Sequence, residues 1–201
     1  MIRVILADDE RLIRDAVAGM LSLVDDIEVV GTASTADEAV TLAVATEPDV
    51  AVLDVQMPGE SGLTVPKELA DRGLATRCLI LTSHAVSGTM QKAMVSGAQG
   101  FVPKDIPVSE LVDIIRKIAA GDRYVDPSIA AESLSQGPNP LTEREIAVLA
   151  VAIGGDPTDE IARLVGLAGS TVRNHLSSAV VKIGAPNRHV AAQVARERGW
   201  I

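Results

Sequence analysis

The chain has 201 residues, a length that suits one domain of about 120 to 130 residues followed by a smaller one. Only Phe101, Tyr124 and Trp200 are aromatic, so the core must be built from aliphatic residues. No uncharged apolar stretch reaches about 18 residues, so neither a membrane span nor a signal peptide is indicated. The single cysteine, Cys78, cannot form an internal disulfide, and we expect a cytoplasmic protein.

The net charge of −9 is unevenly distributed along the chain. Residues 1–140 contain 11 Lys and Arg against 21 Asp and Glu, whereas residues 141–201 contain 7 against 6. The acidity therefore belongs to the first part. Because the second part is nearly neutral, nucleic-acid binding there must depend on the local placement of basic side chains.

The first part alternates between apolar runs with the character of buried strands and segments whose apolar residues repeat every three or four positions, as in helices. Thr35 can cap the start of the second such helix. Asp37 and Glu38 in its first turn suit the positive end of the helix dipole, and Pro48 ends the helix. Crossovers between parallel strands are right-handed and cover both faces of a sheet. The pattern predicts a doubly wound five-stranded parallel α/β domain over residues 1–120, with strands at 3–7, 28–33, 49–53, 77–82 and 100–103.

Beyond residue 120 this alternation fades. Residues 133–140 contain two prolines, a glycine and several small polar residues. We expect residues 121–140 to be a linker, whose length permits two domains to change their relative placement.

Residues 141–201 have a helical period throughout and lack strand-like runs. Thr142 and Glu145 have the spacing of a capping box at the start of a first helix. A second helix, beginning at 156 or 158 and ending before Gly166, has Ile161, Ala162 and Leu164 as its expected apolar face. Further helices are expected at 169–183 and after 187. Two short helices joined by a glycine-containing turn predict an all-α helix-turn-helix domain.

Three aspartates follow the ends of two expected strands: Asp8 and Asp9 after the first, and Asp54 after the third. The carboxyl ends of parallel strands share the edge of the sheet at which ligands bind, so we expect the three carboxylates to converge. Mg²⁺ prefers oxygen ligands and usually takes one or two carboxylates. Asp9 and Asp54 would supply these, and the backbone carbonyl of Gln56 would complete the protein's share.

An ionised Asp54 in such a site can act as a nucleophile towards a phosphoryl group. The transfer also needs a cation and a hydroxyl aimed at the phosphoryl oxygens, and Lys104 and Thr82, at the ends of two further strands, supply them. Taken singly, an aspartate after a strand can be a helix cap, Lys104 a solvated charge and Thr82 an ordinary strand end. The conjunction at four strand ends favours phosphoryl transfer.

Four segments resemble, in order and spacing, the receiver domain of two-component response regulators. They are Asp8-Asp9-Glu10, residues 52–59, Leu81-Thr82-Ser83 and residues 97–105. The resemblance covers residues 1 to about 120 and implies a flavodoxin-like fold. It also implies that Asp54 accepts a phosphoryl group from a histidine kinase, that Asp8 and Asp9 belong to the Mg²⁺ site, and that Ser83 and Lys104 contact the phosphoryl group.

The same resemblance implies that Thr82 and Phe101 form a switch pair that moves inward on phosphorylation. Phe101 stands where the family often has Tyr. Gln56 stands two residues after Asp54, where phosphatases of the haloacid dehalogenase type have an acidic proton donor. We therefore expect no enzymatic activity beyond Mg²⁺-dependent self-phosphorylation and slow autodephosphorylation. The phosphorylated state should then persist.

Residues 141–145, 160–162, 170–175, 182–183 and 187–188 resemble the C-terminal four-helix DNA-binding domain of the NarL/FixJ class, which also occurs in LuxR-type activators. The segments 139–142 and 196–201 are most similar to the subgroup that regulates membrane-lipid desaturation.

A helix-turn-helix places its second helix in the major groove, where only one helix face reaches the DNA. On residues 169–183, Arg173 is expected to read guanine and Asn174 adenine. Lys182 and Arg188 are expected to hold phosphates, whereas His175 fits either a structural or a phosphate contact. The expected DNA-contacting set is Ser170, Thr171, Arg173, Asn174, Ser177, Lys182 and Arg188.

Family members often have basic residues at the positions of Ser177 and Asp159, and both are missing here. Fewer phosphate contacts weaken non-specific binding. We therefore expect the monomer to bind DNA poorly and pairing of two copies to supply the affinity.

We therefore expect the protein to be a transcriptional regulator that accepts a phosphoryl group on Asp54, forms a homodimer and binds double-stranded promoter DNA. One alternative is a phosphorylation-independent, ligand-responsive transcription factor with the same output domain. That protein would be expected to lose the acidic pocket or Lys104, and this chain keeps both. Another alternative is a magnesium-dependent phosphohydrolase, which Gln56 and the second domain oppose.

Overall fold

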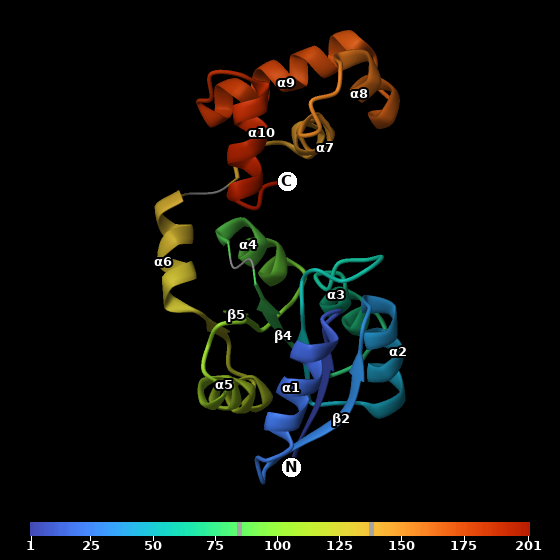
Figure 1. Ribbon diagram of the computed structural model, residues 1–201, viewed down its shortest axis with the longest axis vertical. Coiled ribbons are helices and arrows are strands. Elements are labelled where there is room, and N and C mark those ends of the chain that lie inside the picture. Colours follow the sequence, from blue (N-terminus) through green and yellow to red (C-terminus); the bar gives the residue numbers. More distant parts are fainter. Residues whose placement is uncertain (84–85, 137–138) are drawn as a thin grey trace. The chain divides into compact units, whose positions relative to one another are not determined.

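The computed structural model describes residues 1–83, 86–136 and 139–201. The chain divides into two compact units, the first formed mainly by residues 1–130 and the second mainly by residues 131–201 (Figure 1). Each unit has its own hydrophobic core. In the part of the chain that the structure describes, no helix combines the length and apolarity that crossing a bilayer requires.

The first unit is built on a parallel sheet with strand order β2-β1-β3-β4-β5-β6. The five strands expected from the sequence are confirmed, each beginning within one residue of its expected start. A short sixth strand extends the edge beside β5. The strands are β1 (Ile2–Ala7), β2 (Ile27–Ala33), β3 (Val50–Leu53), β4 (Arg77–Thr82), β5 (Gly100–Pro103) and β6 (Tyr124–Val125).

Helices cover both faces of this sheet, because successive side chains of a strand point to opposite faces. In β1, Val4 and Leu6 belong to the core beneath α1 (Arg11–Leu21) and α5 (Val108–Ala120). Ile5 and Ala7 belong to the opposite core. That core is covered by α2 (Ala36–Thr46), α3 (Val65–Asp71) and α4 (Ser87–Val95) (Figure 1). The doubly wound architecture is therefore confirmed.

Local sequence signals place the ends of several elements. The hydroxyl of Thr35 accepts a hydrogen bond of 3.2 Å from the backbone amide of Glu38, which confirms the expected cap of α2. The helix ends at Thr46, two residues before Pro48. In these places the local pattern is sufficient, because both partners lie within one turn of helix.

The stretch expected to be a linker contains regular structure, which corrects that expectation. β6 pairs in parallel with Gly100 and Phe101 of β5, and α6 (Pro127–Gln136) follows it. Ile129 of α6 is buried in the core of the first unit. The prolines and serines of this stretch interrupt the apolar repeat by which a helix is predicted from sequence. One buried side chain nevertheless anchors it. Residues 137 and 138 of the expected linker lie outside the described residues.

The second unit consists of helices α7 (Glu143–Ala152), α8 (Thr158–Val165), α9 (Gly169–Ile183) and α10 (Arg188–Glu197), as expected. The capping box is confirmed, since Thr142 and Glu145 exchange hydrogen bonds between side chain and backbone. One expectation for α8 is wrong. Ile161 and Ala162 are buried, but Leu164 is 54% exposed, because this helix of about two turns buries only a narrow stripe.

Candidate functional site

Three aspartates converge at the carboxyl edge of the sheet. Strands β1 and β3 are neighbours, with Ala7 paired to Leu53, so the residues that follow them emerge side by side. One carboxylate oxygen from each of Asp8, Asp9 and Asp54 lies within 4.8 Å of the others. Asp8 and Asp54 are buried, and Asp9 is exposed. This is the point at which the strand order reverses, where ligands bind in open parallel sheets.

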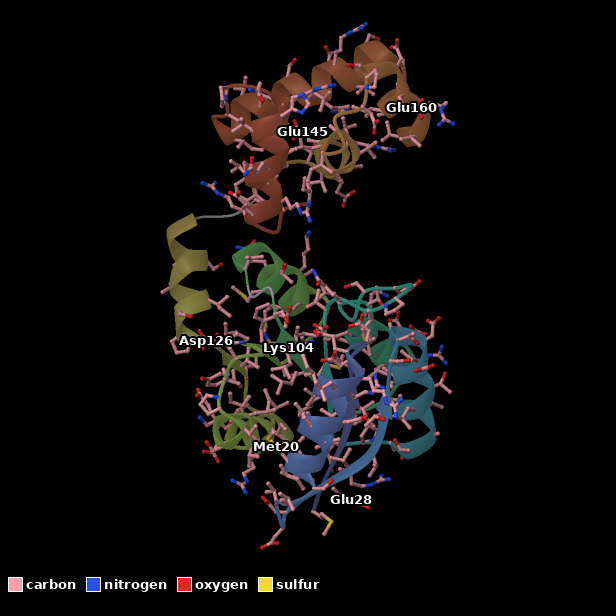
Figure 2. The ribbon with its side chains drawn as sticks, viewed as in Figure 1. Met20, Glu28, Lys104, Asp126, Glu145 and Glu160 are labelled. Carbon is pink, nitrogen blue, oxygen red and sulfur yellow. The ribbon has the colours of Figure 1, made fainter. Side chains whose placement is uncertain are left out.

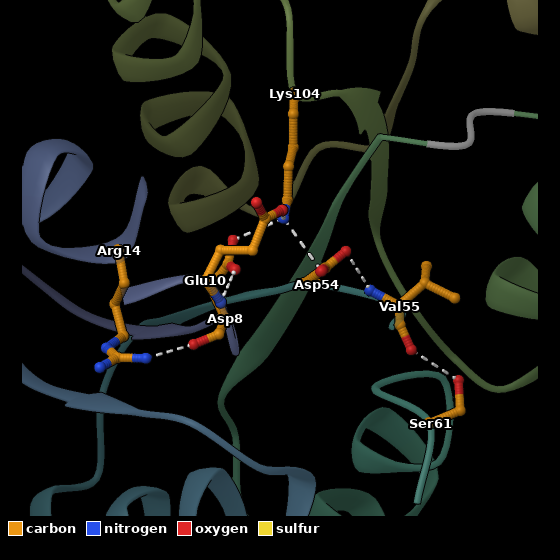
Figure 3. Close-up of polar contacts among 7 residues, drawn as sticks. All are labelled: Asp8, Glu10, Arg14, Asp54, Val55, Ser61 and Lys104. Carbon is orange, nitrogen blue, oxygen red and sulfur yellow. Dashed lines mark hydrogen bonds and ion pairs between the residues drawn. The ribbon is translucent and has the colours of Figure 1, made fainter. Parts of the chain in front are cut away.

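Lys104, just beyond β5, supplies the balancing positive charge (Figure 3). Its ammonium Nζ lies 2.7 Å from Asp8 Oδ2, 2.9 Å from Asp54 Oδ2 and 3.4 Å from Glu10 Oε1. The Lys104 side chain is only 9% exposed. Burial by itself lowers the pKa of Lys104, but its hydrogen bonds to Asp8 and Asp54 outweigh this effect and raise the pKa. Lys104 is therefore a permanent cation in the pocket.

Asp54 is held at both carboxylate oxygens. Oδ1 accepts a hydrogen bond of 2.7 Å from the backbone amide of Val55, and Oδ2 accepts one from Lys104. Burial raises the pKa of the Asp54 carboxyl, and this outweighs the lowering effect of the hydrogen bond and charge of Lys104. A further cation beside Asp54 would favour its ionised form.

The loop that carries Asp8 and Asp9 is held from α1. Arg14 donates a hydrogen bond from Nη1 to the backbone carbonyl of Asp8, while the backbone amide of Glu10 donates to Asp8 Oδ1 at 2.9 Å (Figure 3). Nothing in the sequence singles out Arg14, because its target is a backbone group that every residue possesses. Glu10 lies in the acidic motif, but its approach to Lys104 depends on the fold.

The loop after β3 brings Gln56 beside Asp9, and both line a surface hollow of about 540 Å³. Ser61 Oγ donates to the carbonyl of Val55 at 3.0 Å, and so does the amide of Gly62 at 3.1 Å. A Cβ atom on Gly62 would lie 1.8 Å from the carbonyl oxygen of Asp54. Only glycine therefore lets this loop close against Asp54.

The remaining expected residues lie around the neighbouring strand ends. Thr82 is buried at the end of β4, and its carbonyl accepts a hydrogen bond of 2.9 Å from the amide of Lys104. Ser83 is exposed. Phe101 is fully buried in the core that includes Ala93 of α4. Its ring already points into the core. The expected inward movement on phosphorylation would require an exposed ring, and the structure does not show one.

The second candidate site is the exposed face of α9. Val172, Leu176 and Ala179 face the core of the helical unit. The expected DNA-contacting side chains on this helix lie away from that core: Ser170, Arg173, Asn174 and Ser177 are exposed and Thr171 is half-buried. The spacing of the two faces follows from the helical repeat.

Lys182 and Arg188 have partners within the helical unit. Lys182 Nζ lies 2.7 Å from Glu145 Oε2, and Arg188 Nη2 donates a hydrogen bond of 3.0 Å to the carbonyl of Asp156. Their roles as phosphate contacts therefore remain predictions, and Lys182 has a competing partner.

Comparison with known proteins assigns both units. Residues 4–116 match the family model for the response regulator receiver domain, and residues 139–195 match the model for bacterial regulatory proteins of the luxR family. The chain belongs to the LuxR-type response regulators. It is a transcription regulator with a receiver domain and a DNA-binding domain, not a classical enzyme, and its oxygen-only cluster of Asp8, Asp9 and Asp54 is consistent with a divalent metal site.

Individual relatives are similar over the full length of this response regulator. It is 38% identical over 201 residues to the uncharacterized transcriptional regulatory protein YvfU of Bacillus subtilis, with all of both chains covered. It is 37% identical to the transcriptional regulatory protein DesR of the same organism, covering 100% of this chain and 99% of DesR. The crystal structure of the response regulator ChrA from a heme-sensing two-component system is similar at 32% identity and a TM-score of 0.60, covering 100% of this chain and 98% of ChrA. The chain is thus a homologue of DesR, at nearly the same identity as to YvfU.

Proposed function

We propose that Asp54 is the phospho-acceptor of the receiver domain and that a cognate histidine kinase supplies the phosphoryl group. The observation that carries the proposal is that Asp8, Asp9 and Lys104 surround the buried carboxylate of Asp54. In this reaction an oxygen of Asp54 forms a bond to phosphorus while the phosphorus–nitrogen bond to the kinase histidine breaks. The product is an acyl phosphate on Asp54 and a free histidine side chain on the kinase.

The ion proposed for the site is Mg²⁺, held by Asp8, Asp9, Asp54 and the backbone carbonyl of Gln56. Hard oxygen donors and one exposed carboxylate, that of Asp9, suit a cation that keeps several of its waters. When bound, Mg²⁺ neutralises charge on the phosphoryl oxygens.

The surrounding side chains have distinct proposed roles. Lys104 would pair with a phosphoryl oxygen, exchanging part of its contact with Asp54. Thr82 and Ser83, at the end of β4 and just after it, would contact the phosphoryl group and, with Phe101 of the neighbouring strand, carry the response away from Asp54. Because Phe101 is already buried, the proposed switch is a repacking of the core beside α4. Gln56 offers no acid or base for rapid hydrolysis, so the acyl phosphate would persist.

For the second domain, we propose that phosphorylation produces a homodimer whose two α9 helices meet promoter DNA. The match to the luxR family and the exposed polar face of α9 support this role. Ser177 and Asp159 are both exposed and supply no positive charge, which favours a requirement for two copies. DNA as the partner and the single buried cysteine, Cys78, which has no second cysteine for an internal disulfide, agree with a cytoplasmic location, which we propose as well.

The test is phosphorylation of the purified chain with Mg²⁺ and acetyl phosphate as the donor. We expect an acid-stable, base-labile phosphoryl group that is absent in Asp54→Asn and retained in Asp37→Asn, which removes an exposed carboxylate of α2. Labelled protein should sediment as a dimer and bind DNA more tightly. Steady release of phosphate would favour the phosphohydrolase, and absence of labelling with unchanged DNA binding would favour the ligand-responsive factor.

A further inference from the structure

Glu145 is a buried carboxylate in the helical domain, only 4% exposed (Figure 2 labels it on α7). Its Oε2 accepts a hydrogen bond of 2.7 Å from the backbone amide of Thr142 and one of 2.7 Å from Lys182 Nζ. Its Oε1 accepts one of 2.6 Å from the hydroxyl of Ser178. Both oxygens of this carboxylate therefore have donors within the domain, and two of the donors come from α9.

The two α9 donors are one helical turn apart. Ser178 and Lys182 are four residues apart, so they lie above one another on the same face of α9. The apolar contacts of Val172 and Leu176 with the core resist separation of the helices but are not directional. Two polar contacts to one buried carboxylate are directional, and they set how far α9 is rotated about its own axis.

We propose that Lys182 is a positioning residue which, paired with Glu145, holds α9 in the rotation that presents Arg173 and Asn174 to DNA, and that it does not itself bind a phosphate. The inference rests on the proposed role of α9 as the DNA-reading helix. It replaces the phosphate contact that the sequence alone predicts for Lys182.

The energetics of the pair support this assignment. Moving the Lys182 ammonium to a DNA phosphate would leave Glu145 as a buried charge without its cation, which is strongly unfavourable. Burial by itself would raise the pKa of Glu145, but the hydrogen bonds from Lys182, Ser178 and Thr142 outweigh it and lower the pKa to about 2. The carboxylate is therefore charged at every pH at which DNA binding is measured.

Glu145→Gln separates the two roles by the sign of its effect. Removing a negative charge and releasing Lys182 should strengthen DNA binding if Lys182 can contact a phosphate. If the pair positions α9, the same change should weaken binding. The matched control is Glu160→Gln, which makes the same change of charge in the exposed Glu160–Arg163 pair of α8.

The experiment measures binding of the full-length, acetyl phosphate-treated chain to a mixed-sequence DNA duplex of roughly 40 base pairs, enough for two half-sites, across a range of salt. We expect Glu145→Gln and Lys182→Met each to lower affinity by roughly three- to thirtyfold, which lies within the range of coupling energies between contacting residues. The slope of log affinity against log salt should stay unchanged, whereas a lost phosphate contact lowers it by about one. Lys182→Arg should retain binding, because it keeps the ion pair.

Two results would overturn the inference while leaving the proposed function intact. One is binding by Glu145→Gln as tight as, or tighter than, that of the unmodified chain. The other is a salt slope lowered by about one in Lys182→Met. If either variant fails to fold, Ser178→Ala removes the second anchor alone and should give a smaller loss at unchanged slope, and no loss would count against the inference. Failure of the unmodified chain to bind DNA at any salt would instead contradict the proposed function.

Discussion

The backbone amide of Asp126 donates a hydrogen bond of 3.1 Å to the carbonyl oxygen of Phe101. Phe101 lies in β5, three residues before Lys104, and Asp126 stands between β6 and α6, where its carboxylate accepts a hydrogen bond of 2.9 Å from the amide of Ser128 (Figure 2 labels Asp126 and Lys104). The strand that ends just before the proposed phosphoryl-binding Lys104 is thus hydrogen-bonded directly to the segment leading out of the receiver. A shift of β5 would therefore also move the start of α6.

A first prediction concerns the anchoring of this segment. Ile129→Ala should destabilise the receiver by about 2–4 kcal/mol, because it leaves a cavity in the core. The matched control is Leu134→Ala in the same helix, where the side chain is 87% exposed and the expected change is within about 0.5 kcal/mol. Urea unfolding of the full chain measures both. Equal effects of the two substitutions would mean that Ile129 is not an anchor.

A second prediction concerns the charge balance of the pocket. Lys104→Met leaves Asp8 and Asp54 facing each other without their shared cation, so we expect the free energy of unfolding to fall by roughly 3–5 kcal/mol in the absence of metal. Adding Mg²⁺ should recover part of this loss, because the ion supplies the missing positive charge. Thermal unfolding with and without Mg²⁺ measures the difference. If Mg²⁺ stabilised the variant no more than it stabilises the unmodified chain, that result would contradict the proposed metal site.

A third prediction uses two glycines in different surroundings. Gly62→Ala places a methyl group against the carbonyl of Asp54, so we expect a loss of about 1–3 kcal/mol and weaker Mg²⁺ binding as the loop moves. Gly19→Ala on the exposed side of α1 meets nothing within 4 Å and should stabilise by roughly 0.5–1 kcal/mol. Unfolding curves and calorimetric Mg²⁺ titration distinguish the two. Unchanged Mg²⁺ affinity in Gly62→Ala would show that the loop after β3 does not shape the site.

A fourth prediction concerns pH and Glu145. Its pKa is lowered on folding to about 2 from an ordinary value of 4.5, so its stabilising contribution is fully present above that ordinary value and is lost as the pH falls towards 2. Glu145→Gln should therefore destabilise the helical domain at neutral pH, and the difference from the unmodified chain should shrink between about pH 4.5 and 2. Fluorescence of Trp200, the sole tryptophan, follows unfolding of this domain because its side chain is buried in that core. A difference independent of pH would exclude the ionised form as the cause.

The acidic pocket could be predicted because its geometry follows from topology. Asp8, Asp54 and Lys104 each follow a strand, and all parallel strands bring their carboxyl ends to one edge of the sheet. Topology does not predict the role of Arg14, because its contact depends on the rotation of α1 over the sheet. The burial of Phe101 is not predicted by topology either, because it depends on the helix that covers the strand.

The sequence by itself determined the alternation of five strands with helices over residues 1–120, the helices of residues 141–201, the caps at Thr35 and Thr142, and the residue types available for phosphoryl transfer. These depend on neighbours within a few positions, or on the one edge that a parallel sheet provides. Only the tertiary structure decided that Ile129 is anchored in the receiver and that Lys182 meets Glu145, 37 residues away. Such pairings are set by how helices pack against one another, and the spacing of residues along the chain does not encode them.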